Sequence, residues 1–230
     1  MNQSTIERIF RQCNPEYQHR WEAYETVLDA AITGQTVWLD IGCGKNEFVA
    51  RFGGKARNAI GIDLLDCKDR SDAPFLQADL RHIPLPSGYA NLITLRLVVE
   101  HLERGSDDLA DVCRLLDPGG RLIILTTNSL SPIIFLPRLL PYRQKSWTIQ
   151  KMFGVASHDI FPTFHRFNSP RKMARGFDDM APVRLDYLEG VPLDRPFLTL
   201  LFAVWYAIAK IPGLRRLRSN LLAVFQKRSI

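Results

Sequence analysis

An apolar segment that ends in an acid and two glycines constrains this chain most. It reads Val37-Trp38-Leu39-Asp40-Ile41-Gly42-Cys43-Gly44, and a helical pattern begins in the residues from Lys45 to Phe48. Glycines let the backbone come close to a ligand, and the start of a helix offers unpaired N–H groups. A strand, a glycine turn and a helix in this order predict a loop that binds a nucleotide-type cofactor.

A second apolar segment, Ala59-Ile60-Gly61-Ile62-Asp63, also ends in a carboxylate. It follows the first acid by about twenty residues, which is the spacing of sites that bind the two hydroxyls of a ribose. The two segments together favour a cofactor that contains adenosine.

The residues after the glycines separate two cofactor classes. A dinucleotide site has the pattern G-x-G-x-x-G, with a pyrophosphate at the helix start. Here Lys45, Asn46 and Glu47 follow Gly44, so the third glycine of that pattern is absent. An acid at Asp40, before the glycines, suits the amino-acid part of a cofactor better than a phosphate. This combination points to S-adenosylmethionine.

Four segments within roughly residues 35–128 share their order and spacing with a known family. They are Leu39–Gly44, Gly61–Leu64, Gln77–Leu80 with Ile83–Pro86, and Val98–Leu102 with Leu116–Arg121. Through them the chain resembles the class I S-adenosylmethionine-dependent methyltransferases, in particular the family with ubiquinone-biosynthesis-type and type 11 domains. It departs from that family at Asn46, where a third glycine is usual, and at Asn91, where an acid usually opens the fourth strand.

The resemblance implies which residues hold the cofactor. It places Asp40, Gly42 and Gly44 at the methionine end, and Asp63, followed by Leu64, at the ribose hydroxyls. The alternative for each aspartate is a structural role, as a helix N-cap or a loop carboxylate.

The adenine and the substrate side have their own candidates. Asp79 would accept a hydrogen bond from the adenine amino group, while the Leu80 N–H donates to a ring nitrogen. Arg96 and Leu97 are expected to face the cofactor or the substrate.

The predicted fold is α/β: a doubly wound, mostly parallel, Rossmann-like sheet of seven strands, preceded by N-terminal helices. A chain of 230 residues with 46% apolar content is long enough for one such domain. Apolar periodicity predicts helices near 4–12, 18–32, 107–116 and 170–176, a turn at 117–120, and strands near 36–41, 58–63, 91–95, 121–127, 183–188 and 221–226.

Within this single domain, 1–230, we expect four parts. They are an N-terminal helical extension at 1–34, a cofactor-binding half at 35–128, a lid-like insertion at 129–168, and a hydrophobic, basic insertion at 195–218.

The four cysteines indicate the compartment. Cys13, Cys43, Cys67 and Cys113 lack the paired spacing of metal ligands, so we expect no metal site and no disulfide framework. The first residues do not form a basic start followed by an apolar stretch, so no signal peptide is expected. A cytoplasmic protein is the expectation, with peripheral contact to the cytosolic face of a membrane.

Charge is distributed unevenly along the chain. Residues 1–128 carry 14 Lys and Arg against 18 Asp and Glu, a net charge of −4, whereas residues 129–230 carry 16 against 6, a net charge of +10. Two stretches of the basic part, 132–143 and 197–218, are also strongly apolar. A helix over 197–211 would be about 22 Å long, short of the roughly 30 Å of a bilayer core. We expect it to lie at an anionic membrane surface; the alternative is a helix in the core or at a dimer interface.

Histidines are the candidate catalytic residues. His158 and His165 lie in an aromatic segment, 158–169, that follows the fifth strand and could close over an acceptor, and His101 follows the fourth strand. A neutral histidine can accept the proton of a hydroxyl group. The alternative is that these histidines only hold the loop through hydrogen bonds.

The predicted function is methyl transfer from S-adenosylmethionine to oxygen of a small hydrophobic or lipid-linked acceptor near a membrane surface. One alternative is an RNA methyltransferase, because a basic half can follow phosphates; nucleic acid is the less favoured partner, because the basic residues accompany apolar segments. A second alternative is a non-catalytic scaffold that binds the cofactor.

Overall fold

The computed structural model describes residues 3–67, 69–135, 162–177, 179–192 and 196–229. The chain divides into two compact units. The smaller unit comprises Met1–Ala23, Asn128–Pro162 and Tyr187–Asn220, and the larger unit comprises Tyr24–Thr127, Thr163–Asp186 and Leu221–Ile230.

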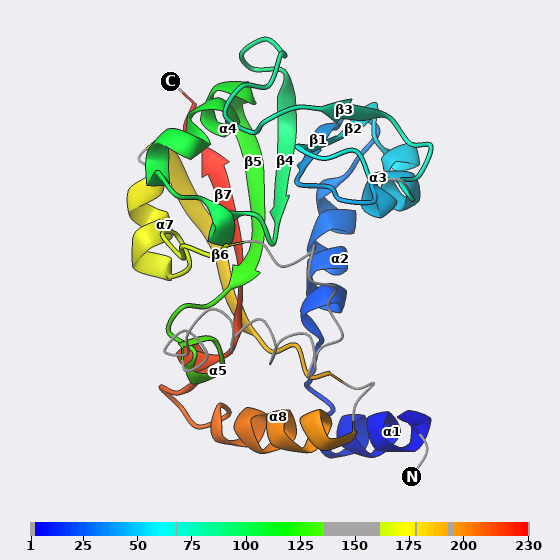
Figure 1. Cartoon of the computed structure of the whole chain (residues 1–230), viewed down its shortest axis with the longest axis vertical. Coiled ribbons are helices and arrows are strands. Elements are labelled where there is room, and N and C mark those ends of the chain that lie inside the picture. The colour runs from blue at the N-terminus through cyan, green and yellow to red at the C-terminus, as the bar shows by residue number, and fades with distance from the viewer. Residues whose placement is uncertain (1–2, 68, 136–161, 178, 193–195, 230) are drawn as a thin grey trace. The chain divides into compact units, whose positions relative to one another are not determined.

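The larger unit is built on a sheet with the strand order β3-β2-β1-β4-β5-β7-β6 (Figure 1). The strands are β1 (Val37–Ile41), β2 (Asn58–Asp63), β3 (Phe75–Gln77), β4 (Ala90–Arg96), β5 (Leu116–Thr127), β6 (Met180–Leu188) and β7 (Asn220–Lys227). From β3 to β5 all neighbours pair in parallel, and Figure 1 shows β7 pointing opposite to β5. The predicted doubly wound, mostly parallel seven-stranded sheet is confirmed.

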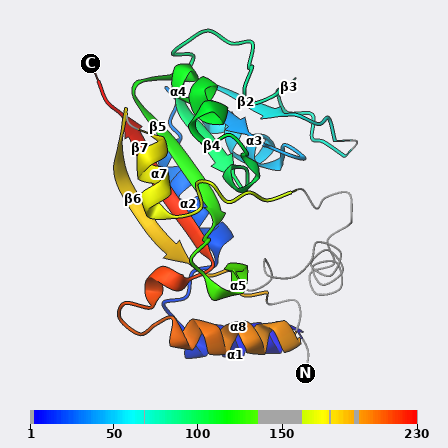
Figure 2. The same cartoon turned by 60° about the vertical axis from the view of Figure 1, so that its left-hand side comes forward.

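The central strands are apolar because helices cover both faces of a parallel sheet. Trp38, Leu39, Ile93 and Leu95 are completely buried. Figure 2 shows α2 (Arg20–Ala31) behind the sheet and α7 (Pro170–Gly176) in front of it. The other helices of this unit are α3 (Glu47–Phe52) and α4 (Ala110–Leu115), with 3₁₀ turns at Gly53–Lys55, Val99–His101 and Gly105–Leu109.

Asn91, one of the two departures from the family pattern, joins the starts of two strands. Its Oδ1 accepts a hydrogen bond from Val37 N–H (2.9 Å), and its Nδ2 donates to Gln35 O (3.1 Å). An amide can both accept and donate, which a carboxylate cannot do. Asn91 therefore ties the start of β4 to Val37, the first residue of β1, and to Gln35 just before it.

Two sequence predictions about local structure were wrong in detail, and one strand was missed. Asp117–Gly120 is part of β5 rather than a turn. The register of β5 against β4 shifts between Ala90 and Leu92, so these residues form a bulge, and Gly119 with φ +79° supplies the backbone conformation that the bulge needs. The helix expected at 107–116 divides into a 3₁₀ turn and the shorter α4. The three-residue strand β3 was not predicted, since so short a segment has no readable periodicity.

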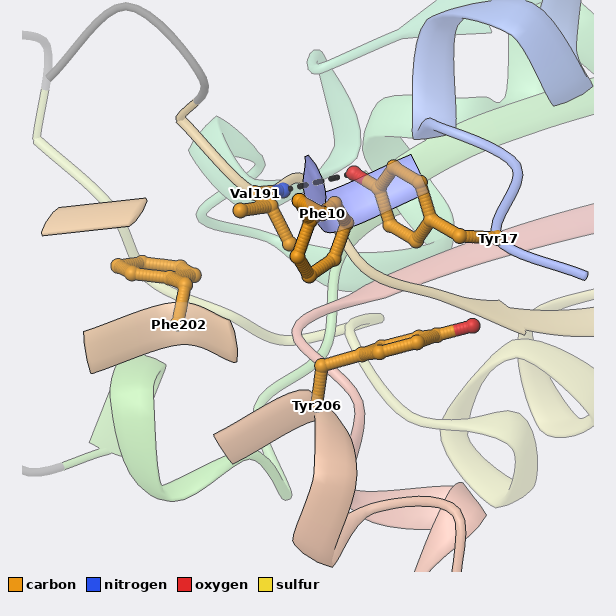
Figure 3. Close-up of a cluster of buried hydrophobic side chains, with 5 residues drawn as sticks. All are labelled: Phe10, Tyr17, Val191, Phe202 and Tyr206. Carbon is orange, nitrogen blue, oxygen red and sulfur yellow. Dashed lines mark hydrogen bonds between the residues drawn. The ribbon is translucent and has the colours of Figure 1, made fainter. Parts of the chain in front are cut away.

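The smaller unit contains α1 (Gln3–Cys13), α5 (Pro132–Phe135), α8 (Pro196–Ile208) and a 3₁₀ turn at Arg215–Leu217. Helices α1 and α8 lie side by side in Figures 1 and 2. Between them is a cluster of buried side chains, shown in Figure 3: Phe10, Tyr17, Val191, Phe202 and Tyr206. Tyr17 Oη accepts a hydrogen bond from Val191 N–H (3.0 Å) and donates to Glu189 O (3.3 Å).

The helices of the described ranges are all too short or too polar to cross a bilayer. This includes α8, the helix that the sequence predicted over 197–211, which ends at Ile208.

His19 gives the smaller unit a pH-dependent stability. Burial, and after it the charge of Arg20, lowers the pKa of His19 from 6.5 to about 4. Between these values the unfolded chain binds a proton that the folded chain does not, so the free energy of unfolding falls as the pH decreases from 6.5 towards 4. The full shift would correspond to roughly 3 kcal/mol, and partial solvent exposure reduces this figure.

Urea unfolding of the wild type and of His19→Gln, near neutral pH and near the lower pKa, measures this effect. We expect the wild type to lose more stability than the variant on acidification. Equal losses would show that another group is responsible.

Candidate functional site

The loop after β1 depends on Gly42. Its φ is +74°, and a Cβ at this position would lie 2.1 Å from Val98 Cγ2. Its N–H donates a hydrogen bond to Ile62 O (2.7 Å), as does the N–H of Cys43 (3.2 Å). Any other residue at 42 would be strained and would collide with a neighbouring segment.

Asp63 connects the end of β2 to this loop. One carboxylate oxygen accepts a hydrogen bond from Gly44 N–H (2.8 Å), and the other accepts one from Leu65 N–H (3.1 Å). Gly44 has φ +56°, and a Cβ there would meet nothing within 4 Å. The next side chain, Leu64, is 60% exposed. The structure thus brings the predicted ribose carboxylate, the glycine loop and an exposed apolar side chain together.

Asn46, the second departure from the family pattern, keeps a glycine-like conformation. Its φ is +59°, a left-handed geometry that asparagine tolerates better than most residues. The side chain is buried, and its Nδ2 donates to Ala73 O and Pro74 O, both at 3.1 Å. Gly61 makes room for it, because a Cβ on Gly61 would lie 2.0 Å from Asn46 Oδ1. Asn46 therefore takes a conformation that a glycine at this position could also adopt.

Asp40 is completely buried below the loop. Its Oδ1 accepts a hydrogen bond from Thr94 Oγ1 (2.6 Å), and Thr94 Oγ1 accepts one from Trp38 Nε1 (2.8 Å). Its Oδ2 lies 3.8 Å from Arg96 Nη2. Burial raises the pKa of Asp40, and the charge of Arg96 and the bond from Thr94 oppose this shift. Sequence reasoning selected Asp40 and Arg96, but it missed Thr94 and Trp38.

Arg96 and Leu97 lie at the carboxyl end of β4. The Arg96 guanidinium donates to Cys43 O (3.3 Å) and lies 4.2 Å from the centre of the Phe48 ring. Leu97 has φ +57°, a strained value for a leucine. Such strain persists where the surrounding structure enforces it, and it is frequent at functional sites. Leu97 N–H donates to Leu125 O (2.8 Å), which holds the backbone in this conformation.

Asp79, the predicted adenine ligand, is exposed enough to meet a cofactor and carries a full charge. Its Oδ1 accepts hydrogen bonds from Arg81 N–H (3.0 Å) and Arg81 Nε (2.9 Å). The bond from the Arg81 side chain lowers the pKa of Asp79 to about 2. An ionised carboxylate only accepts hydrogen bonds, as recognition of an amino group requires.

The candidate catalytic histidines fall on two adjacent segments. His101 ends the 3₁₀ turn Val99–His101. The carbonyl of Glu100, the preceding residue, accepts hydrogen bonds from Phe164 N–H (2.8 Å) and His165 N–H (3.2 Å). His165 is buried and has φ +52°. His158 lies outside the described residues, as does most of the expected lid segment.

Cys43 lies inside the predicted cofactor loop and is buried. Burial, followed by the charges of Asp40 and Asp63, raises the pKa of its thiol to about 12. The thiolate, which is the reactive form, is therefore nearly absent at neutral pH.

A buried polar network missed by sequence reasoning fastens the His165 segment to the sheet. Thr126 Oγ1 donates to Glu100 Oε2 (2.7 Å), and Asn168 Nδ2 donates to Thr126 Oγ1 (2.6 Å) and Thr127 O (3.0 Å). Glu100, Thr126 and Asn168 are all buried. Two threonines at the end of an otherwise apolar strand were the signal in the sequence.

Comparisons with known proteins agree with this geometry. The family described as "Methyltransferase domain" matches residues 7–177. Ubiquinone/menaquinone biosynthesis C-methyltransferase UbiE from Stutzerimonas stutzeri is 28% identical over 152 residues, which are 59% of this chain and 58% of that protein. UbiE from Pseudomonas fluorescens (strain SBW25) is 27% identical over 137 residues, 51% of this chain and 53% of that protein. The chain thus spans about half the length of these curated relatives.

Solved structures show the same fold. An S-adenosylmethionine-dependent methyltransferase from Mesorhizobium loti has a TM-score of 0.57 at 16% identity, over 90% of this chain and 98% of that one. Geranyl diphosphate C-methyltransferase from Streptomyces coelicolor, solved with S-adenosyl-L-homocysteine, has a TM-score of 0.55 at 16% identity, over 90% of this chain and 79% of that one.

Thr94→Val tests the buried support of the loop. Valine is close to threonine in size but neither donates to Asp40 nor accepts from Trp38 Nε1. Because this leaves buried polar groups unsatisfied, we expect a loss of about 2–4 kcal/mol in the free energy of unfolding. Thr94→Ser keeps the hydroxyl and should lose only about 1 kcal/mol. Urea unfolding compares the two variants, and equal losses would contradict a role for the hydroxyl.

Proposed function

Because this chain belongs to the methyltransferase-domain family, we propose that it transfers the methyl group of S-adenosylmethionine to a small hydrophobic or lipid-linked acceptor at the cytosolic face of a membrane. The observation that carries the proposal is the bond between Gly44 N–H and the Asp63 carboxylate. It joins the glycine loop after β1 to the acidic end of β2. Both lie at the carboxyl ends of parallel strands, where nucleotide cofactors bind in such sheets.

The residues present fit this cofactor. Open space around Gly44 and the exposed Leu64 flank the Asp63 carboxylate. Asp63 would accept hydrogen bonds from the ribose hydroxyls, and Leu64 would cover an apolar face of the adenine. Asp79 would accept from the adenine amino group beside the Leu80 N–H.

The positive charge of Arg96 and the buried carboxylate of Asp40 suit the amino-acid end of the cofactor. Arg96 can pair with a carboxylate, and the negative charge of Asp40, whose Oδ2 lies 3.8 Å from Arg96 Nη2, can favour an ammonium group. Gly42 and Gly44 allow the backbone to approach this end.

The bound cofactor supplies an electrophilic methyl group on a sulfonium. The protein's task is then to exclude water, align the acceptor and accept a proton. We assign the last role to His101 or His165, on the two segments joined through Glu100 O. A neutral imidazole can accept the proton of a hydroxyl.

Oxygen is the first candidate for the acceptor atom, and carbon is the second. The curated relatives carry the name C-methyltransferase, although the match spans about half of their length. The two candidates differ in the product: label would reside in a methoxy group or in a C-methyl group. The protein is incubated with labelled S-adenosylmethionine and a membrane lipid extract, and NMR of the labelled product decides between the two atoms. An extract that takes up no label would count against the lipid acceptor.

Asp63→Ala tests the ribose assignment. It removes a charged acceptor of hydrogen bonds, so we expect cofactor binding to weaken by about 1.5–3 kcal/mol. Calorimetric titration with S-adenosylhomocysteine measures this loss. The control is Asp29→Asn, which changes an exposed aspartate of α2 that pairs with Lys55. Unchanged affinity in Asp63→Ala would exclude the ribose role.

His101→Gln and His165→Gln test the proposed base. The variant that removes the base should lower the rate of label transfer about 100-fold, because general-base catalysis typically contributes 10²–10⁴-fold. Its affinity for S-adenosylhomocysteine should remain that of the wild type. His82→Gln, at an exposed histidine, is the control. If neither variant slows transfer, alignment of the acceptor alone drives the reaction.

A further inference from the structure

Helix α8 is apolar on two opposite faces. The inner face, formed by Leu198, Phe202, Tyr206 and Ala209, is buried, and Phe202 and Tyr206 belong to the cluster of Figure 3. The outer face comprises Phe197 (76% exposed), Leu200 (67%), Leu201 (51%), Val204 (54%), Ile208 (42%) and, just past the helix, Ile211 (53%). At 3.6 residues per turn these six side chains fall within an arc of about 100°.

Large apolar side chains are exposed mainly in this unit. Of the fourteen such side chains in the described residues, nine belong to the smaller unit: the six of the outer face together with Ile9, Leu130 and Phe135. Single exposed apolar residues are ordinary, but a continuous apolar stripe marks an interaction site.

The charged residues that follow α8 in the chain are all positive. Helix α8 contains no charged residue, and the exposed Arg215 and Arg216 follow it. Lys210 is also exposed and pairs with Glu16 (2.6 Å). Residues 129–230 carry 16 Lys and Arg against 6 Asp and Glu. An apolar stripe that is followed along the chain by exposed arginines complements a lipid bilayer, which is apolar inside and anionic at its surface.

The size of the outer face argues against a protein partner. A helix of this length covers about 20 Å by 10 Å, or roughly 200 Å², whereas a stable protein interface buries about 800 Å² on each partner. A bilayer needs no complementary shape, and an amphipathic helix inserts only part of its circumference.

We propose that the outer face of α8 binds an anionic lipid bilayer, with α8 lying in the plane of the interface and Arg215 and Arg216 at the headgroups. The 13 residues of α8 are too few to span the bilayer, which takes about 20. The proposal rests on the proposed function for the lipid-linked acceptor, whereas its test measures binding alone.

Sedimentation of the full chain with vesicles tests the proposal. Vesicles of phosphatidylcholine with phosphatidylglycerol should bind the wild type, and vesicles of phosphatidylcholine alone should bind it more weakly. The double variant Leu200→Ser/Val204→Ser should reduce binding at least about tenfold, since both side chains lose their apolar surface. Val183→Ser/Leu185→Ser, which changes two exposed apolar residues of β6, is the matched control and should bind as the wild type does.

Arg215→Gln/Arg216→Gln separates charge from apolar contact. Its binding to the anionic vesicles should fall to the weaker level of the neutral ones, which it should bind as the wild type does. Phe197→Trp, at the most exposed position, adds a direct reading of depth, because bromine-labelled lipid should quench its fluorescence more than that of the wild type.

Three outcomes would overturn the proposal: no binding of the wild type to anionic vesicles, equal loss in the β6 control, or a dimer that Leu200→Ser/Val204→Ser dissociates while vesicles bind neither form. Circular dichroism of the same samples shows that each variant is folded, and calorimetry with S-adenosylhomocysteine tests the cofactor site separately. Cofactor binding without vesicle binding would refute only this proposal, and vesicle binding without cofactor binding would refute only the proposed function.

Discussion

The hydrogen bond from Gly44 N–H to the Asp63 carboxylate holds together the two strand ends on which the site is built. It works with the bonds from Gly42 and Cys43 to Ile62 O, so that the loop after β1 is fastened to β2 at three points. Both glycines have positive φ, and Gly42 has no room for a side chain. The carboxylate that shapes the loop is therefore also the proposed ribose ligand, and the exposed Leu64 follows it in the chain.

Much of the fold and of the cofactor half could be predicted because its signals are local. A buried strand, a glycine turn and an acid at a strand end are each written within a few residues, and the strands at 36–41, 58–63 and 91–95 correspond to β1, β2 and β4. Asn46, a departure from the family pattern, adopts a left-handed conformation that glycine also allows, and Gly61 leaves space for its side chain.

What the sequence did not reveal depends on contacts between distant residues. Trp38, Asp40 and Thr94 meet across β1 and β4, and Glu100, Thr126 and Asn168 meet across three segments. No spacing along the chain encodes such pairs. The same limit applied to α8: its uniform hydrophobicity left core packing and surface contact as alternatives, whereas the structure buries one face against Phe10 and Tyr17 and exposes the other.

Calorimetric titration of the purified chain with S-adenosylhomocysteine, with NADH as the control ligand, tests the central claim most directly. The geometry of Asp63, Leu64 and the glycine loop predicts saturable binding of S-adenosylhomocysteine in the micromolar range and no binding of NADH. Absence of binding, or a preference for NADH, would contradict the assignment of this site to S-adenosylmethionine.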